Sequence, residues 1–463
     1  MTQSNTFTHR LVEHVVRTRH EALPPAAIES TKTFVLDSLG VALSGTRVPL
    51  VATLKEVAAG WGAGQAARIW GTGEQVPAAT AAFINGYQIH NQEWDCVHEP
   101  AVVHPMAVVL SSLLAFAEDE RFRTQTRING AEWLTGCVVA VDVAALIGAA
   151  THNKLRFFRP AMCGALGATA GMANILRWSP AQTQSALGLA YSQLSGTMQA
   201  HVEGSPVLPM QIGFNTRAAL TAIALARHDI RGPMDFLEGP FGYFSLIDPD
   251  WSAETIESLA APHAICQLSH KPFPSGRATH GGVDGALTLQ HEHGFDIADI
   301  KEIRVFAPPL VRQLVDRPAI IGMAPAYARL CLPYVVASAL LTGSVDVQDF
   351  ERHALDAPER HELATKIRVC PDLNPALNAL APQRVEVDLM DGRRHHMDLP
   401  AVLGAPGRPL SREQHLAKFT RAAGSGLRPM TTPTMAKLIE LIDHLPELAD
   451  MTAVVDAMMF DPA

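Results

Sequence analysis

The segment from His90 to Pro105 concentrates side chains that could carry out proton-transfer chemistry. It reads His-Asn-Gln-Glu-Trp-Asp-Cys-Val-His-Glu-Pro-Ala-Val-Val-His-Pro, so three imidazoles, three carboxylates and a thiol fall within sixteen residues. Apolar sequence with helical periodicity flanks it on both sides, so ionisable groups gather where their neighbours are being buried. Such a concentration is typical of an active site.

Two other interpretations of this segment stay open. It could be a polar loop between two helices, in which Pro105 begins the second helix and Asp and His side chains cap helix ends. It could also be a metal site, because His90, Asp95, His98 and His104 are competent ligands. Their spacing matches neither His-Glu-x-x-His nor a Cys/His finger, so the spacing itself does not indicate a metal.

A second polar segment runs from His270 to His280 and reads His-Lys-Pro-Phe-Pro-Ser-Gly-Arg-Ala-Thr-His. Two prolines fix the turn, which carries Lys271 and Arg277. A lysine and an arginine on a rigid turn are expected for a cationic clamp on carboxylates. The alternative is an ordinary loop between domains.

Length and composition limit the class of protein. The 463 residues are too many for one ordinary core and predict two or three domains. With 48% hydrophobic and 18% charged residues, the chain should be helix-rich and globular.

The net charge of −9, without basic stripes, argues against nucleic acid as a partner. The most apolar run, about residues 133–150, carries Asp142 and is expected to be a buried helix, not a membrane span.

Six scattered cysteines without Cys-x-x-Cys spacing, and a start without an apolar signal core, predict a reduced, cytoplasmic protein.

The elements that must position the first segment are predicted to be helices. One helix should run from Pro77 to about His90, and the next should begin at Pro105, so the segment lies between two helix ends.

Small residues from Cys163 to Gly171 follow no clear strand, so they indicate close helix packing rather than a nucleotide-binding loop.

After Trp251 the pattern changes. Alternating residues predict strands at about 303–306, 367–369, 385–389 and 394–399, with helices between them. The predicted fold is therefore mainly α, with a large all-helical domain and an inserted smaller α+β domain. Residues 1–266 form the first part of the helical domain, 267–405 the α+β domain, and 406–463 a helical tail that completes the first domain.

Together the two polar segments resemble the MmgE/PrpD family, which includes 2-methylcitrate dehydratase, cis-aconitate decarboxylase and iminodisuccinate epimerase. The first is similar to its H-x-x-D-[FY]-D-D-T-H-x-P-[SA]-x-x-H-P signature, and the second to its K-x-[FY]-P-x-x-R-x-T-H segment. A third match runs from Ala328 to Ala337 and resembles A-K-[FH]-S-x-x-Y. The resemblance implies a helical domain with an α+β lid, a homodimer, no metal and no cofactor. The Ala- and Gly-rich helical surface predicts that the dimer forms through the helical domain.

Dehydration, decarboxylation and epimerisation of a polycarboxylate all place negative charge on the carbon beside a carboxylate. Each needs a base, a proton donor and fixed cations. We expect His104 to be the base and Lys271 the acid or electrostatic stabiliser, with Asp95 orienting a base and Tyr334 donating to an oxyanion. The expected substrate-binding residues are Arg159, Arg277, His98, His280 and Glu93. The expected site is a cleft between the two domains, with His104 on one side and Lys271 on the other.

Three functions follow from these groups. The first is a cofactor-independent lyase, a dehydratase or decarboxylase, acting on a small di- or tricarboxylate. The second is an isomerase that uses two bases on a dicarboxylate, and the third is a non-catalytic carboxylate-binding or scaffold protein.

The chain also departs from the family pattern. Asp95-Cys96-Val97 stands where the family has D-D-T, Glu93 where an Asp is usual, and Arg159 where a His is common. The segment that begins at Leu208 lacks the basic residues of the family's K-x-x-H-x-G-x-A-A. We therefore expect 2-methylcitrate and cis-aconitate to be poor substrates, and a more anionic or shorter acid, gripped by Arg159, to be preferred.

Overall fold

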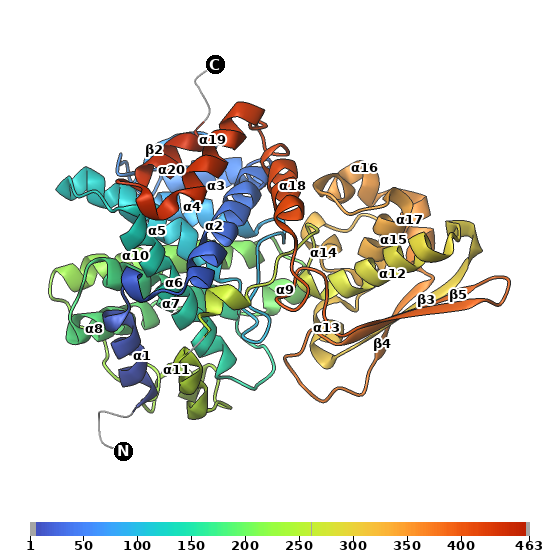
Figure 1. Cartoon of the computed structure of the whole chain (residues 1–463), viewed down its shortest axis with the longest axis horizontal. Coiled ribbons are helices and arrows are strands. Elements are labelled where there is room, and N and C mark those ends of the chain that lie inside the picture. Colours follow the sequence, from blue (N-terminus) through green and yellow to red (C-terminus); the bar gives the residue numbers. More distant parts are fainter. Residues whose placement is uncertain (1–5, 261, 460–463) are drawn as a thin grey trace.

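The computed structural model describes residues 6–260 and 262–459, and it divides into a helical part and a smaller part built on a sheet (Figure 1). The fold is mainly α, as predicted. The helical part contains a two-stranded β-ribbon, β1 (Ala67–Arg68) and β2 (Gln75–Val76). Its helices, in chain order, are α1 (Phe7–Arg17), α2 (Pro25–Gly45), α3 (Leu50–Ala59), α4 (Ala78–His90), α5 (Pro105–Thr124), α6 (Gly130–Ala149), α7 (Arg159–Ile175), α8 (Pro180–Tyr191), α9 (Gln199–Glu203), α10 (Val207–Arg227) and α11 (Tyr243–Leu246).

Helix α6 is long and apolar enough to cross a membrane, but 89% of its most apolar window is buried inside the protein. It packs against α7, where glycines allow the two backbones to approach. A Cβ atom on Gly167 would lie 2.3 Å from the backbone oxygen of Ala140, and one on Gly171 would lie 2.5 Å from that of Gly136. The small residues of α7 therefore serve helix packing, as the sequence predicted.

The second part has a four-stranded sheet in the order β4-β3-β5-β6. Strands β3 and β4 are parallel, and the other pairs are antiparallel. Helices α12 and α15 pack against the sheet and against each other. The elements are α12 (His280–His293), β3 (Ile300–Ala307), α13 (Pro309–Val315), α14 (Pro325–Ala328), α15 (Leu332–Thr342), α16 (Arg352–Leu355), α17 (Pro358–Ala364), β4 (Ile367–Pro371), β5 (Gln383–Leu389) and β6 (Arg394–Leu399).

The C-terminal helices, red in Figure 1, return to the helical part, where the first two pack against the blue α2 and the last packs against α5. They are α18 (Arg412–Ala423), α19 (Thr432–Asp443) and α20 (Thr452–Ala457). Phe419, Leu438 and Val454 belong to the same buried core as the N-terminal helices. The predicted helical tail is not continuous, because α19 ends at Asp443 and Pro446 cannot continue an α-helix.

Candidate active site

A backbone pairing joins the two polar segments. The Val97 amide donates to the Ser269 carbonyl oxygen at 3.0 Å, and the Ser269 amide donates back to Val97 at 2.7 Å. The first segment connects α4 to α5, and the second precedes α12 at the edge of the sheet domain. This pairing places Lys271 beside Glu93 and Asp95, so side chains from distant parts of the chain meet in one cluster.

Lys271 is fully buried and bound by the first segment. Its Nζ atom donates to Glu93 Oε2 at 3.0 Å and to the Glu93 backbone oxygen at 3.1 Å, and it lies 4.0 Å from Asp95 Oδ1. Burial opposes ionisation of Glu93, but Lys271 and His90 outweigh it and lower the pKa of Glu93 to about 2. Glu93 also has a φ of 54°, a left-handed conformation that costs energy for a residue other than glycine.

His90 forms a second buried ion pair. Its Nδ1 atom lies 3.0 Å from both carboxylate oxygens of Asp95. Burial opposes protonation of His90, but the carboxylates of Asp95 and Glu93 outweigh it, and the pKa of His90 is raised above the ordinary imidazole value. His90 is therefore the imidazole of the cluster that holds a proton most readily.

His104, unlike His90, is held in the neutral state. Its Nδ1 atom lies 3.0 Å from the Cys96 backbone oxygen and 3.5 Å from Asp95 Oδ2. Both partners only accept, so we assign the ring proton to Nδ1, which leaves the lone pair on Nε2. Burial and the nearby Lys271 lower the pKa of His104 to about 4, so the ring is neutral near pH 7. The His90 and His104 rings lie side by side, with centroids 5.0 Å apart.

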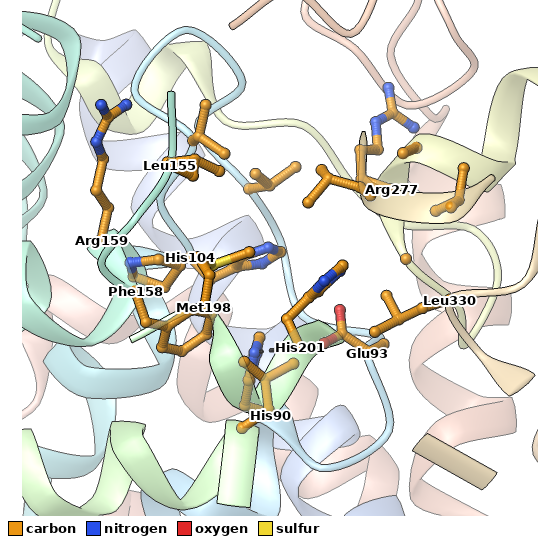
Figure 2. A pocket seen from close by; sticks show the side chains of 18 of the residues that line it. His90, Glu93, His104, Leu155, Phe158, Arg159, Met198, His201, Arg277 and Leu330 are labelled. Atoms are coloured by element: carbon orange, nitrogen blue, oxygen red, sulfur yellow. Dashed lines mark ion pairs between the residues drawn. The ribbon is translucent and has the colours of Figure 1, made fainter. Parts of the chain in front are cut away.

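A cavity lies between the two parts of the protein and is lined by residues of both, a usual place for a small-molecule site. Figure 2 shows His90, Glu93, His104 and His201 gathered within it. Most of the remaining wall is apolar. The helical part contributes Val97, Val102, Leu155, Phe158, Met198 and Leu208, and the sheet part contributes Leu314, Val315, Leu330 and Leu380.

His201 is a cavity residue that sequence reasoning missed. An Nη2 atom of Arg317 faces its Nδ1 at 3.4 Å, and because a guanidinium can only donate, the ring proton belongs on Nε2. That Nε2 is buried and has no hydrogen-bond partner among the described residues. Burial and Arg317 lower the pKa of His201 to about 4. His201 lies outside both polar segments, so no motif could have identified it.

The two arginines expected to bind substrate are already engaged by carboxylates. Arg159 donates from Nε and Nη2 to the two oxygens of Asp248, at 3.1 and 3.2 Å. Arg277 donates from Nε to Glu99 at 2.8 Å and also to backbone oxygens of the second segment and the connection after β6. Figure 2 shows both guanidinium groups turned away from the cluster of imidazoles. Both residues line the cavity, and Nη1 of Arg159 is buried without a hydrogen-bond partner among the described residues. Because Asp248 and Glu99 offset their charges, the expected role of free carboxylate-binding cations is corrected to that of internally paired ones.

Three further expectations are wrong because of where the side chains lie. Tyr334 is fully buried in the core of the sheet domain, and its hydroxyl donates to the Asp349 backbone oxygen at 2.7 Å. His98 contacts Gln267 at 3.2 Å and lines a different pocket. His280 is buried against the Ser275 carbonyl, 3.2 Å from its Nε2 atom. Within the described chain, none of the three lines the central cavity.

The structure also bears on the metal hypothesis. His90, Asp95 and His104 present potential ligand atoms within 4.8 Å of one another, whereas His98 does not join this group. The Lys271 ammonium lies 4.0 Å from Asp95, where its charge would oppose a divalent ion. Lys271, Glu93, His90 and Asp95 instead form a buried ion-paired cluster, and His104 lies at its edge, 3.5 Å from Asp95.

Comparison with known proteins identifies the family. Residues 9–255 match the MmgE/PrpD N-terminal domain, and residues 273–440 match the MmgE/PrpD C-terminal domain. Human cis-aconitate decarboxylase is 26% identical, over 98% of this chain and 95% of its own length. The cis-aconitate decarboxylase of Aspergillus terreus is 23% identical, over 95% of this chain and 94% of its own length. The chain therefore belongs to the MmgE/PrpD family.

Proposed function

We propose that the protein is a lyase, a dehydratase or decarboxylase, that moves a proton at the carbon beside a substrate carboxylate without help from a cofactor. The decarboxylase relatives and the family membership support the reaction class. One observation carries the assignment of roles. A neutral imidazole with a free Nε2 atom, on His104, lies beside an imidazole of raised pKa, on His90, at the same cavity.

In a dehydration, His104 Nε2 would take the proton from the carbon beside the carboxylate. The C–H electron pair would form the new C=C bond as the C–O bond breaks, and His90 would give its proton to the leaving hydroxide. In a decarboxylation, the bond to the departing carboxylate would break, and the electron pair left on carbon would take a proton from an imidazole. Both reactions develop charge that fixed donors stabilise best when water is excluded.

Lys271 takes a different role from the one its sequence suggested. Within the described ranges it does not line the cavity, and its ammonium is bound to Glu93. We therefore assign Lys271 to positioning: it holds Glu93 ionised and in its left-handed conformation, and Glu93 in turn keeps His90 charged. Asp95 orients both imidazoles through their Nδ1 atoms.

An isomerase is the second candidate, favoured by the same pair of rings, because one can remove a proton and the other return it. Proton NMR in D₂O with a panel of carboxylic acids separates the possibilities. A lyase gives net loss of water or carbon dioxide. An isomerase exchanges the α-proton without that loss. If acids bind but neither exchange nor product appears with any of them, the enzyme proposal fails in favour of a carboxylate-binding protein.

A further inference from the structure

Asp142 is a buried carboxylate within the long apolar helix α6. It is only 4% exposed, so an ionised carboxylate without partners would be costly there. Its Oδ1 atom accepts the Ala264 amide at 2.7 Å. Its Oδ2 atom lies 3.0 Å from His14 Nε2 and 2.6 Å from His263 Nδ1. One carboxylate therefore joins α6 to α1 and to the 3₁₀ turn η4 (Ala264–Gln267), which leads into the second polar segment.

The charge of Asp142 is balanced by imidazoles and not by a lysine or arginine. Burial opposes its ionisation, but hydrogen bonds from His14 and His263 outweigh burial and lower the pKa of Asp142 to about 2. Within residues 6–260 and 262–459, these two rings are the only groups that form an ion pair with it. An imidazole supplies positive charge only when it is protonated, whereas a metal ion held by the same three side chains would supply it directly.

Three clusters of the described chain bring ligand atoms of two histidines and one aspartate within 4.8 Å of one another. In the cluster at the central cavity, the Lys271 ammonium lies 4.0 Å from the carboxylate. In the cluster around Asp37, the Lys418 ammonium lies 2.7 Å from the carboxylate. A fixed ammonium opposes a divalent ion. Among the residues that the structure describes, the Asp142 cluster is the one without an ammonium or guanidinium within 4.0 Å of its carboxylate.

The Asp142 cluster also has open space beside it. Asp142 and His263 line a pocket separate from the central cavity, with Ser258 and Gln267 in its wall. Two imidazole nitrogens and a carboxylate oxygen are a zinc ligand set, and the pocket leaves a fourth position for water. In a tetrahedral site with bonds of about 2.0–2.2 Å the ligand atoms lie roughly 3.4 Å apart, so the contacts to Asp142 need to lengthen by less than about 1 Å.

We propose that His14 Nε2, Asp142 Oδ2 and His263 Nδ1 bind a divalent transition-metal ion, with Zn²⁺ as the best match and water from the pocket as the fourth ligand. The ion would fasten α1 and η4 to α6. Because η4 leads into the second polar segment, the ion would brace the place where the two polar segments pair. It would lie outside the central cavity and take no part in the reaction proposed above.

Titration calorimetry with ZnCl₂ tests the site, using the full chain stripped with EDTA and then freed of EDTA. One Zn²⁺ should bind per chain with micromolar or tighter affinity, and the melting temperature should rise with the Zn²⁺ concentration. MgCl₂ and CaCl₂ should give neither effect, because those ions prefer oxygen ligands. If no saturable Zn²⁺ binding appears in the micromolar range, or if Mg²⁺ binds as well as Zn²⁺, the inference is wrong.

Variants assign the ion to this cluster. His14→Gln and His263→Gln each remove one ligand, so the Zn²⁺ affinity should fall by at least about tenfold, since loss of an outer-shell partner alone costs about 10–100-fold. His9→Gln is the matched control, because His9 also lies on α1 but has a side chain that is 40% exposed. If His14→Gln does not fold, His263→Gln, which lies outside the long helices, carries the test. Unchanged affinity in the folded variants would overturn the inference.

His104→Gln separates this site from the central cavity, whose imidazoles are also competent zinc ligands. This variant should bind Zn²⁺ as the wild type does. If Zn²⁺ binding is instead lost in His104→Gln and kept in His263→Gln, the ion belongs to the central cavity and the inference fails. None of these measurements requires turnover, so their outcome is independent of the proposed function.

Discussion

The Nδ1 atom of His104 lies 3.0 Å from the backbone oxygen of Cys96, and this contact decides which ring nitrogen can act as a base. A carbonyl oxygen only accepts hydrogen bonds, so it keeps the proton on Nδ1 and leaves Nε2 free. Pro105 follows directly and begins α5 with a restricted backbone, which holds His104 at the helix start. The proposed base is therefore held in one orientation by the backbone of its own segment.

Replacing His104 by Gln should lower kcat by roughly 10²–10⁴-fold, the usual contribution of a general base, with a smaller effect on KM. The measurement is product formation by NMR with the best acid of the panel. His98→Gln is the matched control, because His98 belongs to the same segment but lines another pocket. Comparable losses in both variants would show that the segment matters for folding and would remove His104 from the base role.

The activity should depend on pH through both imidazoles. The pKa of His104 is lowered to about 4, so kcat/KM should rise as the pH increases through about 4, where the base loses its proton. The pKa of His90 is raised, so activity should fall again only above the ordinary imidazole range, as His90 loses the proton that it donates. A rate that still climbs between about pH 6 and 8 would contradict a base of lowered pKa. His90→Asn should remove the high-pH decline.

The sequence predicted the helical and α+β parts and the meeting of the two polar segments, because hydrophobic periodicity and local motifs report those features directly. His104 and Lys271 do converge, since both contact the Asp95 carboxylate, at 3.5 and 4.0 Å. Sequence could not show which cations are free. Asp248 lies 89 residues from Arg159, and Glu99 lies 178 residues from Arg277, so both pairings depend on tertiary structure.

The role expected of Tyr334 was wrong for a different reason. The family-like motif does not show which side of α15 faces the cavity, and Tyr334 lies on the side that packs into the core of the sheet domain. His201 was missed because it is a single histidine on a five-residue helix, and its importance comes only from the cavity and from Arg317.

The Lys271–Glu93 pair should stabilise the fold as a unit. Lys271→Met leaves a buried carboxylate and Glu93→Gln leaves a buried ammonium, so each should cost about 3–5 kcal/mol of unfolding free energy. The double variant should cost clearly less than the sum of the two, as measured by urea denaturation. Additive costs would show that the two groups stabilise the fold independently.

The same pair predicts a pH dependence of stability. The pKa of Glu93 is lowered from 4.5 to about 2, so its contribution is complete above pH 4.5 and is lost as the pH falls towards 2. The stability difference between wild type and Glu93→Gln should therefore shrink across that window. If the stability difference between wild type and Glu93→Gln were unchanged at the low-pH end of this window, the Glu93 charge would not be what stabilises the fold.

We expect activity without a divalent metal ion. A metal bound by His90, Asp95 and His104 would need a lone pair on His90, whose pKa is raised, and would sit near the Lys271 ammonium. Dialysis against EDTA should leave the rate unchanged, and elemental analysis of the dialysed, active protein should find no stoichiometric metal. Loss of activity that one specific divalent ion restores would reverse this assignment and turn the cluster into a metal centre.

The Arg159 guanidinium donates two hydrogen bonds to the Asp248 carboxylate. Tyr243 donates to the same carboxylate at 2.9 Å. All three side chains are buried, so Arg159→Met should leave an uncompensated carboxylate and cost about 3–5 kcal/mol of unfolding free energy. Adding Asp248→Asn removes that charge and should recover much of the loss, while KM of the folded enzyme stays close to the wild-type value in both variants. Chemical denaturation and steady-state kinetics on the same preparations measure the two effects separately. A large rise in KM in Arg159→Lys, with no loss of stability, would instead mean that Arg159 releases Asp248 and binds the substrate carboxylate during turnover.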